Sequence, residues 1–550
     1  MFSALLLGLA QVALVLASNA TLDIFDPKVT LDNGVFTGGR LLKTHRFLGI
    51  PFAQPPIGPL RFRLPQPIPA YSGSYNAKFY SLACPQQAMT VPTVPPMAQP
   101  AIDFAVNTIL GVFVPDAEDC LTINVIKPDY ANANSNLPVV LWIFGGGFEI
   151  GSPNQYDGTL IVTRSMTMGK PVIFVSMNYR ISAFGFLSGK EVKSARVGNL
   201  GLQDQREAMR WVQKYISNFG GDPTKVTIFG ESAGAISVSL HMLTNGGNTE
   251  GLFRAALMMS GGPIPVGDIA SPGNQRLYDD LVKAAGCDKS HDSLSCLREV
   301  DYKTLRRAVD QSASFFSRRS LNLAWMPRAD GYFLPENPQK LVMKGSIAKI
   351  PFITGNCDDE GTVFSLSTLD IHTDDEFKGW IRSYFFPDVP DSDVLQLMAL
   401  YSSDITQGSP FGTGWLNAVS RQFKRIAAFQ GDGVFQAPRR LLINYASQKN
   451  PNIWGYLSKR FKALPVAGSA HGSDIINMFS GAELAEALIR LATDLDPNAG
   501  RFGLQWPRYN RHSPDLYTLQ DGIIPVTISP DTYRQAAMAF MTNVTMAYPV

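Results

Sequence analysis

The chain has 550 residues, of which 45% are hydrophobic and 17% charged, against about 25% charged residues in an average globular protein. This composition excludes a disordered, collagen-like or coiled-coil chain, and the length is ample for a large core. The formal charge is only +2, from 48 Lys and Arg against 46 Asp and Glu. Net charge therefore gives no argument for nucleic acid or an anionic membrane as a partner.

The N-terminal segment has the pattern of a secretory signal. It reads MFSALLLGLAQVALVLA, and small residues follow it. The run is too short for a comfortable membrane span. It differs from most signal peptides in that no Lys or Arg precedes the apolar residues. We expect residues 1–20 to be a signal peptide cleaved near 17–20, rather than a buried N-terminal helix. We therefore expect a secreted protein without a transmembrane anchor. The sequon Asn543-Val544-Thr545 is then a candidate N-glycosylation site.

Cysteine usage agrees with an oxidising compartment. Four of the five cysteines form two pairs that are close in sequence, which favours the disulfides Cys84–Cys120 and Cys287–Cys296 and leaves Cys357 free. The sequence alone leaves other pairings open, including five reduced cysteines in the core.

Short apolar runs alternate with amphipathic stretches along the chain. Residues 203–219 carry apolar side chains at helical spacing and charged ones, among them Arg206 and Glu207, on the opposite side, which predicts a crossover helix. Runs that are apolar throughout are typical of a parallel sheet covered on both faces, so the pattern indicates an α/β sandwich. The predicted strands are residues 138–144, 171–177, 225–229, 255–259, 350–354 and 453–461.

No repeat, low-complexity tract or charged linker divides the chain. We therefore expect one domain over residues 21–550, although the length alone would suggest several. Residues 375–448 are mostly helical in pattern and are expected to form a cap layer.

The strongest local signal is the run Gly230-Glu231-Ser232-Ala233-Gly234, which lies between a predicted strand and a helical stretch. G-x-S-x-G in this context is typical of a nucleophile elbow, where a strained turn presents the serine hydroxyl above the sheet. The following helix directs its N-terminal N–H groups toward a developing oxyanion. A structural turn is the less favoured interpretation.

Three consecutive glycines, Gly145 to Gly147, follow the predicted strand 138–144. Glycines let backbone N–H groups approach a tetrahedral oxygen closely, as in the oxyanion loop of lipases and esterases. A phosphate-binding loop would need Lys and Ser or Thr after the glycines, but Phe148 and Glu149 stand there.

Together these motifs resemble the type-B carboxylesterase/lipase family, the cholinesterase-like α/β-hydrolases, and most closely its secreted fungal lipases. The resemblance implies an α/β-hydrolase fold with a large, mostly parallel central sheet flanked by helices. The matching stretches are FLGIPFAQPPIGPLRF (47–62), EDCLTINV (118–125), FGGGFEIGS (144–152), NYRISAFGFL (178–187), GNLGLQDQREAMRWVQKYISNFGGDPTKVTIFGESAG (198–234), DDEGTVF (358–364) and LPVAGSAHGSDI (464–475).

The resemblance also implies a catalytic triad in the chain order of this fold, Ser232, Glu360 and His471. His471 would be the base, and Glu360 would hold its tautomer. Spacing alone does not choose among Asp358, Asp359 and Glu360, and the two aspartates are expected to be loop caps. The oxyanion-hole N–H groups implied by the resemblance are those of Gly146, Gly147 and Ala233.

The segment between Cys84 and Cys120 is expected to hold a lid, within residues 85–119. In the fungal lipases this tethered loop covers the active site, and the alternative is an ordinary amphipathic core helix. The segment contains no tryptophan or tyrosine to hold a choline ammonium group, which disfavours choline esters. Residues 101–114 place four large apolar side chains on one helical face, Ile102, Val106, Ile109 and Phe113.

We therefore expect a secreted serine ester hydrolase for hydrophobic esters such as acylglycerols or sterol esters, acting through an acyl-enzyme on Ser232. The alternatives are an esterase for smaller or aromatic, hydroxycinnamate-type esters and, least favoured, a non-catalytic cholinesterase-like adhesion domain. The expected partner is an ester at a lipid–water interface and not nucleic acid, and the expected state is a monomer or weak dimer. The chain has no CxxC, HExxH or clustered histidines, so neither a metal nor a cofactor is implied.

Overall fold

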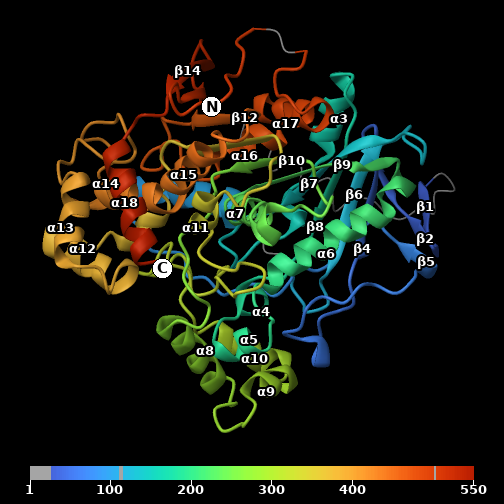
Figure 1. Ribbon diagram of the computed structural model, residues 1–550, viewed down its shortest axis with the longest axis horizontal. Coiled ribbons are helices and arrows are strands. Elements are labelled where there is room, and N and C mark those ends of the chain that lie inside the picture. The colour runs from blue at the N-terminus through green and yellow to red at the C-terminus, as the bar shows by residue number, and fades with distance from the viewer. Residues whose placement is uncertain (1–25, 111–114, 501–502) are drawn as a thin grey trace.

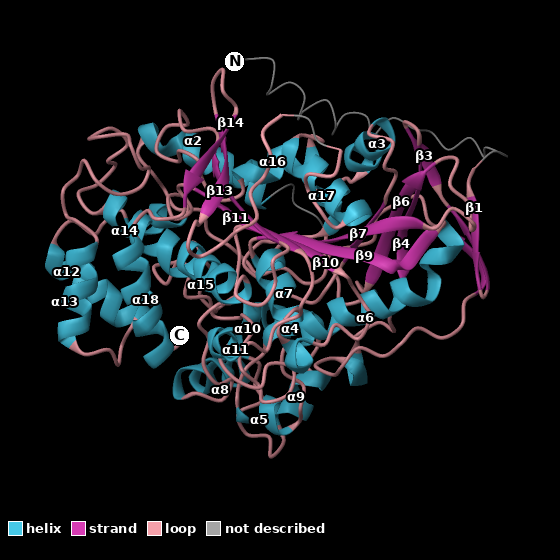
Figure 2. Cartoon of the chain, turned by 45° about the horizontal axis from the view of Figure 1, so that its top comes forward, coloured by secondary structure: helices cyan, strands magenta, loops and turns pink. Residues whose placement is uncertain are grey.

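The computed structural model describes residues 26–110, 115–500 and 503–550, so the expected signal peptide lies outside the described residues. A sheet of 11 strands crosses the molecule in the order β14-β13-β12-β11-β10-β9-β7-β8-β6-β4-β3 (Figures 1 and 2). The strands from β8 to β13 in this order pair in parallel, and the edges pair antiparallel. The strands are β3 (Gly39–Leu41), β4 (Thr44–Pro51), β6 (Thr122–Pro128), β7 (Leu137–Ile143), β8 (Ile173–Met177), β9 (Gly221–Glu231), β10 (Ala255–Met259), β11 (Phe352–Cys357), β12 (Ile453–Lys459), β13 (Asp515–Gln520) and β14 (Val526–Pro530).

All six strands predicted from apolar runs are present, with ends shifted by a few residues. They belong to the parallel part of the sheet, and almost every residue in them is buried. Helices cover both faces, as two-sided burial requires (Figure 2). The predicted fold class, a large, mostly parallel sheet flanked by helices, is confirmed. A second, three-stranded sheet consists of β1 (Lys28–Leu31), β2 (Asn33–Thr37) and β5 (Ser72–Asn76).

Helices α3, α16 and α17 lie on one side of the sheet, and α6, α7 and α15 lie on the other (Figure 2). The segment expected to form a helical cap contains α12 to α15. The described helices are α2 (Gln99–Ala105), α3 (Thr159–Thr167), α4 (Ser182–Phe186), α5 (Lys190–Ser194), α6 (Leu200–Tyr215), α7 (Ala233–His241), α8 (Pro272–Ala284), α9 (Ser293–Glu299), α10 (Tyr302–Val309), α11 (Pro338–Lys344), α12 (Asp374–Trp380), α13 (Asp391–Leu400), α14 (Phe423–Gly431), α15 (Ala437–Ala446), α16 (Ser473–Phe479), α17 (Glu483–Asp494) and α18 (Gln535–Ala547).

The predicted crossover helix is α6, and two of the charged residues on the side opposite its apolar face are buried. Arg206 is 2% exposed and Glu207 is 9% exposed. The reason is a loop that packs over this side of the helix and supplies Glu250, whose carboxylate lies 2.9 Å from the Arg206 guanidinium. Helical spacing therefore predicted the helix correctly, and a tertiary contact accounts for the burial of Arg206.

The lid segment is anchored as predicted, because the disulfide Cys84–Cys120 is formed. Its helix is shorter than the predicted run: α2 ends at Ala105, and a π-helical turn, Val106–Leu110, continues the chain. The π turn changes the angular spacing, so residues beyond it do not continue the α-helical face. Ile102 is buried against the core rather than exposed. The predicted position of Phe113 lies outside the described residues.

The second predicted disulfide, Cys287–Cys296, is also formed, and Cys357 is free and buried. Asn543 is exposed on α18, whereas Thr545 of the same sequon is buried, and glycosylation there stays a prediction. None of the helices in the described part of the chain combines the length and the hydropathy needed to cross a bilayer.

Candidate active site

Ser232 lies between β9 and α7 in a strained backbone conformation, with φ 55° and ψ −126°. A non-glycine residue is rarely held there, and such strain is concentrated at functional sites. The two glycines of the motif make the turn possible. A Cβ on Gly234 would lie 1.9 Å from the carbonyl oxygen of Ile143, and one on Gly230 would lie 2.5 Å from the backbone of Gly234. The spacing of G-x-S-x-G is thus a packing requirement of this turn.

His471 and Glu360 are joined by a hydrogen bond of 2.6 Å between Nδ1 and Oε2. The other oxygen of Glu360 accepts hydrogen bonds from the Asn356 side chain (3.1 Å) and the Cys357 backbone (2.8 Å). These contacts fix the carboxylate, and the carboxylate fixes the imidazole with Nδ1 protonated and Nε2 available as a base. Glu360 follows β11 and His471 follows β12, so both lie at the edge of the sheet where β9 ends at Ser232.

The two aspartates next to Glu360 have different partners. Lys462 pairs with Asp358 at 2.7 Å and with Asp359 at 2.5 Å. Asp359 also accepts hydrogen bonds from the backbone N–H of Ser469 (2.8 Å) and of Phe411 (2.8 Å). Both aspartates therefore position the loops around His471, whereas Glu360 contacts its ring. This arrangement supports Glu360 as the acidic residue.

The glycine loop lies directly against Ser232. A Cβ on Gly145 would approach the Cβ of Ser232 to 2.9 Å, and one on Gly146 would meet the carbonyl oxygen of Ile150 at 2.3 Å. Gly146 and Gly147 have positive φ values of 101° and 63°. Within the described part of the chain, neither of their N–H groups donates a hydrogen bond to protein. Ala233 is the first residue of α7, where N–H groups have no partner inside the helix.

A third carboxyl group completes the surroundings of His471. Oε1 of Glu231 lies 3.3 Å from Nε2 of His471. This nitrogen has no hydrogen-bond partner within the described part of the chain. Burial raises the pKa of Glu231 to about 8, although His471 acts in the opposite direction. Burial alone would lower the pKa of His471, but Glu231 and Glu360 outweigh it and hold that pKa above its ordinary 6.5.

Aromatic rings form an apolar wall beside the imidazole. The ring centroids of Phe364 and Phe435 lie 5.2 Å and 4.4 Å from that of His471. Phe315 packs edge-on against Phe364, and its ring would contact a Cβ on Gly147 at 3.0 Å. A substrate bound between the glycine loop and His471 would therefore meet apolar side chains.

Sequence reasoning missed the roles of two buried acids, Glu231 and Glu149. Glu231 occupies the first variable position of the G-x-S-x-G motif. The motif placed it next to Ser232 but did not predict its contact with His471. Glu149 lies after the glycine loop, accepts a hydrogen bond of 2.9 Å from the Phe315 backbone, and has its pKa raised by burial to about 8. It ties the glycine loop to the apolar wall. In the described residues, no cluster of His, Cys, Asp and Glu side chains has the composition of a metal site.

Comparison with known proteins agrees with this geometry. The family model "Carboxylesterase family" matches residues 26–498, so the chain belongs to that family. Lipase 4 of Diutina rugosa is 42% identical over 94% of this chain and 96% of its own length. Secreted lipase 1 of Botryotinia fuckeliana is 39% identical over 94% and 92%.

The crystal structure of Aspergillus niger EstA superposes with a TM-score of 0.80, at 26% identity, over 96% of this chain and 99% of that chain. Acetylcholinesterase of Bungarus fasciatus is 33% identical over 80% of this chain and 70% of its own length, which agrees with the cholinesterase-like character of the family. The protein is a carboxylic ester hydrolase, and the family predicted from its motifs is confirmed.

Proposed function

We propose that this protein is an extracellular lipase that hydrolyses hydrophobic esters, such as acylglycerols or sterol esters, through an acyl-enzyme on Ser232. The observation that carries the proposal is the convergence of a strained serine, a carboxylate-bound histidine and a glycine loop at one edge of the sheet. The names of the relatives, lipases and a secreted lipase, support the substrate class and the location.

In this mechanism His471 removes the proton from Ser232 as Oγ attacks the ester carbonyl carbon. The resulting oxyanion accepts hydrogen bonds from the N–H groups of Gly146, Gly147 and Ala233. His471 then gives its proton to the departing alcohol, which leaves an acyl ester on Ser232. Water, deprotonated by the same histidine, attacks this ester, and the histidine returns the proton to Ser232 Oγ as the acid leaves. Glu360 stabilises the imidazolium at both stages without taking its proton.

The apolar wall favours hydrophobic acyl groups over small polar ones. Small or aromatic, hydroxycinnamate-type esters form the second candidate class, and the names of the relatives favour the lipase. A non-catalytic adhesion role is not favoured, because the chain carries Ser232, Glu360 and His471 and the last two are joined by a hydrogen bond. The substrate approaches from a lipid–water interface under this proposal, and the protein acts as a monomer or weak dimer.

Covalent labelling tests the nucleophile directly. An organophosphate should phosphorylate Ser232 once per chain, and peptide mapping should find no label on Ser232→Ala. That variant should lose several orders of magnitude in kcat, since binding and the oxyanion hole alone remain. A label on any other serine would refute the assignment.

The acid is tested by two matched amides. Glu360→Gln should lower kcat by a large factor with the fold intact, because the amide cannot hold the required imidazole tautomer and charge. Asp359→Asn should instead act on stability, because Asp359 holds backbone N–H groups and Lys462. An inactive Asp359→Asn enzyme beside a nearly normal Glu360→Gln enzyme would reverse the two roles.

A further inference from the structure

Two loops and a hairpin tip present large apolar side chains to solvent. In the loop between α13 and α14, Trp415 is 72% exposed and Leu416 is also exposed. The loop after β12 carries Phe461, which is exposed as well. At the tip of the β13–β14 hairpin, Ile523 is 101% exposed and Ile524 is 63% exposed. These five residues are called the tip surface below.

The topology brings these loops to the edge of the sheet that bears Ser232. Strands β12 and β13 are parallel and in register at Lys459 and Gln520, so the residues that follow each strand leave the sheet side by side. The backbone N–H of Lys462 donates to Asp521 at 3.1 Å, which joins the loop of Phe461 to the hairpin tip. The β13–β14 hairpin projects from the body of the molecule in both views (Figures 1 and 2).

The loop of Trp415 is attached to the same region. Its Asn417 side chain accepts a hydrogen bond of 3.0 Å from the N–H of Val466, in the loop that leads to His471. The N–H of Phe411, at its other end, donates to Asp359. The tip surface is therefore built on the segments that position His471, and it faces away from the core.

The composition of the hairpin tip is not explained by the turn itself. Turn positions favour Gly, Asn, Asp, Ser and Pro, and Asp521 and Gly522 fit that preference. Isoleucine is β-branched and favours strands, so two adjacent exposed isoleucines give the turn neither suitable backbone geometry nor core burial. Contact with an apolar surface would bury these two side chains, which the fold alone leaves in water.

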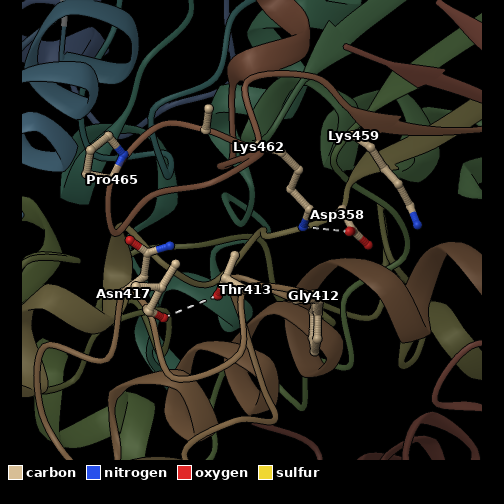
Figure 3. Close-up of a pocket in the computed structure, with 10 residues that line it drawn as sticks. Asp358, Gly412, Thr413, Asn417, Lys459, Lys462 and Pro465 are labelled. Carbon is tan, nitrogen blue, oxygen red and sulfur yellow. Dashed lines mark hydrogen bonds and ion pairs between the residues drawn. The ribbon is translucent and has the colours of Figure 1, made fainter. Parts of the chain in front are cut away.

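Two lysine side chains lie beside the loop that carries Trp415 and Leu416. Lys459 and Lys462 line a hollow of about 700 Å³, together with residues of the 411–417 loop (Figure 3). Lys462 points toward Asp358, whereas Lys459 makes no ion pair within the described part of the chain. Apolar tips beside an ammonium group match a lipid surface that contains carboxylates, such as the fatty acids that ester hydrolysis releases. Tryptophan also favours the boundary between lipid and water.

We infer that the tip surface anchors the enzyme on a lipid–water interface, with Trp415, Ile523 and Ile524 inserted among acyl chains. This inference rests on the proposed lipase function and adds a second contact, separate from the disulfide-tethered lid. Separate protruding tips fit a penetrable lipid surface better than a second copy of this chain, which would require complementary flat or concave features. Anchoring here would hold the catalytic edge of the sheet toward the substrate.

Flotation with emulsified triolein containing oleic acid tests the inference without turnover when every protein carries Ser232→Ala. Ile523→Ser/Ile524→Ser should lower the partition coefficient about tenfold or more, since two large apolar groups no longer leave water. Trp415→Ser should have a separate effect in the same direction. Leu42→Ser is the matched control, because Leu42 is 67% exposed but precedes β4 at the opposite edge of the sheet.

Activity and mass measurements complete the test. With Ser232 present, the tip variants should lose hydrolysis of emulsified triolein while hydrolysing soluble p-nitrophenyl acetate at the wild-type rate. Unchanged flotation, or an equal loss on the soluble ester, would overturn the inference. So would a wild-type dimer that the variants dissociate without any change in flotation, because the occupant would then be a second copy. Failure of the proposed function would appear separately, as absent labelling of Ser232.

Discussion

Glu231 sets the charge that His471 meets at the atom where it must accept a proton. Its carboxyl oxygen lies 3.3 Å from Nε2, on the opposite side of the ring from Glu360. Two acidic neighbours stabilise the imidazolium, so His471 needs a higher pH to become the neutral base than a histidine in water does. The acidic limb of kcat/KM should therefore lie above pH 6.5 rather than at it.

Glu231→Gln should move that limb to lower pH by about one unit, the lower end of the effect of an opposite charge within 4–6 Å. Burial raises the pKa of Glu231 to about 8, so its carboxylate is charged at the alkaline end of this limb. There the amide removes a charge that favours protonated His471, and the neutral base persists to lower pH. The measurement is the pH profile of kcat/KM on a soluble ester, with Glu299→Gln on the exposed end of α9 as control. A limb that stays in place, or that moves to higher pH, would contradict this account.

These residues also show what the sequence could and could not predict about the site. Ser232 and the glycines were predictable because the turn permits few residue types at fixed spacing. Glu360 and His471 came from a family resemblance, since 111 positions separate them and no local pattern links them. The contact of Glu231 with His471 depends on burial and on the fold of β12, so residue type alone gave no indication of it.

At the scale of elements, prediction succeeded where one physical requirement dominated. Central strands such as β7 and β10 are covered on both faces, which leaves a continuous apolar run in the sequence. Edge strands are less constrained, and β14, with exposed and half-buried positions, left no such signal. The burial of Arg206 and Glu207 on α6 was not predicted, because tertiary contacts, which helical spacing does not encode, decide whether a charged side chain meets water.

The disulfide that tethers the predicted lid segment to the rest of the fold can be tested by mutation. Its stem contacts the glycine loop, because the N–H of Gln87 donates to the carbonyl oxygen of Glu149 at 2.9 Å. The disulfide joins residues 36 positions apart and can stabilise the fold by about 4 kcal/mol through loop entropy. Under our prediction that this segment is a lid, loss of the disulfide would leave its stem free to move relative to the glycine loop.

Cys84→Ser/Cys120→Ser should therefore lose the rise in rate that a lidded enzyme shows when tributyrin exceeds its solubility limit. Hydrolysis of a soluble ester at 25 °C should stay within about twofold of wild type, because the triad lies outside the bridged segment. Cys287→Ser/Cys296→Ser is the matched control, since its shorter loop contributes about 3 kcal/mol and does not enclose the lid. Loss of the rise in both variants would point to general destabilisation instead.

At the scale of the whole molecule, a buried ion cluster joins the end of the chain to the cap. Asp531, after β14, binds the guanidinium groups of Arg439 and Arg440 on α15, each at 2.5 Å. The side chains of Asp531 and Arg439 are fully buried. Burial opposes ionisation of Asp531, but the two arginines outweigh it and hold its pKa well below the ordinary 3.8. The cluster thus fixes the last strands of the sheet against α15.

Asp531→Asn should destabilise the protein by about 3–5 kcal/mol at neutral pH, because two buried arginines lose their shared counter-charge. A group with a lowered pKa contributes stability that is present above its unfolded pKa of about 3.9 and is lost as pH falls toward the folded value. The difference in unfolding free energy between wild type and variant should therefore become smaller below about pH 4. Urea midpoints across pH measure this difference, with Asp391→Asn as control. Asp391 is 61% exposed, and each of its ion pairs, with Lys378 and Arg382, should be worth at most about 1 kcal/mol. Equal shifts for the two variants, or a gap that widens in acid, would show that the cluster does not hold the molecule together in this way.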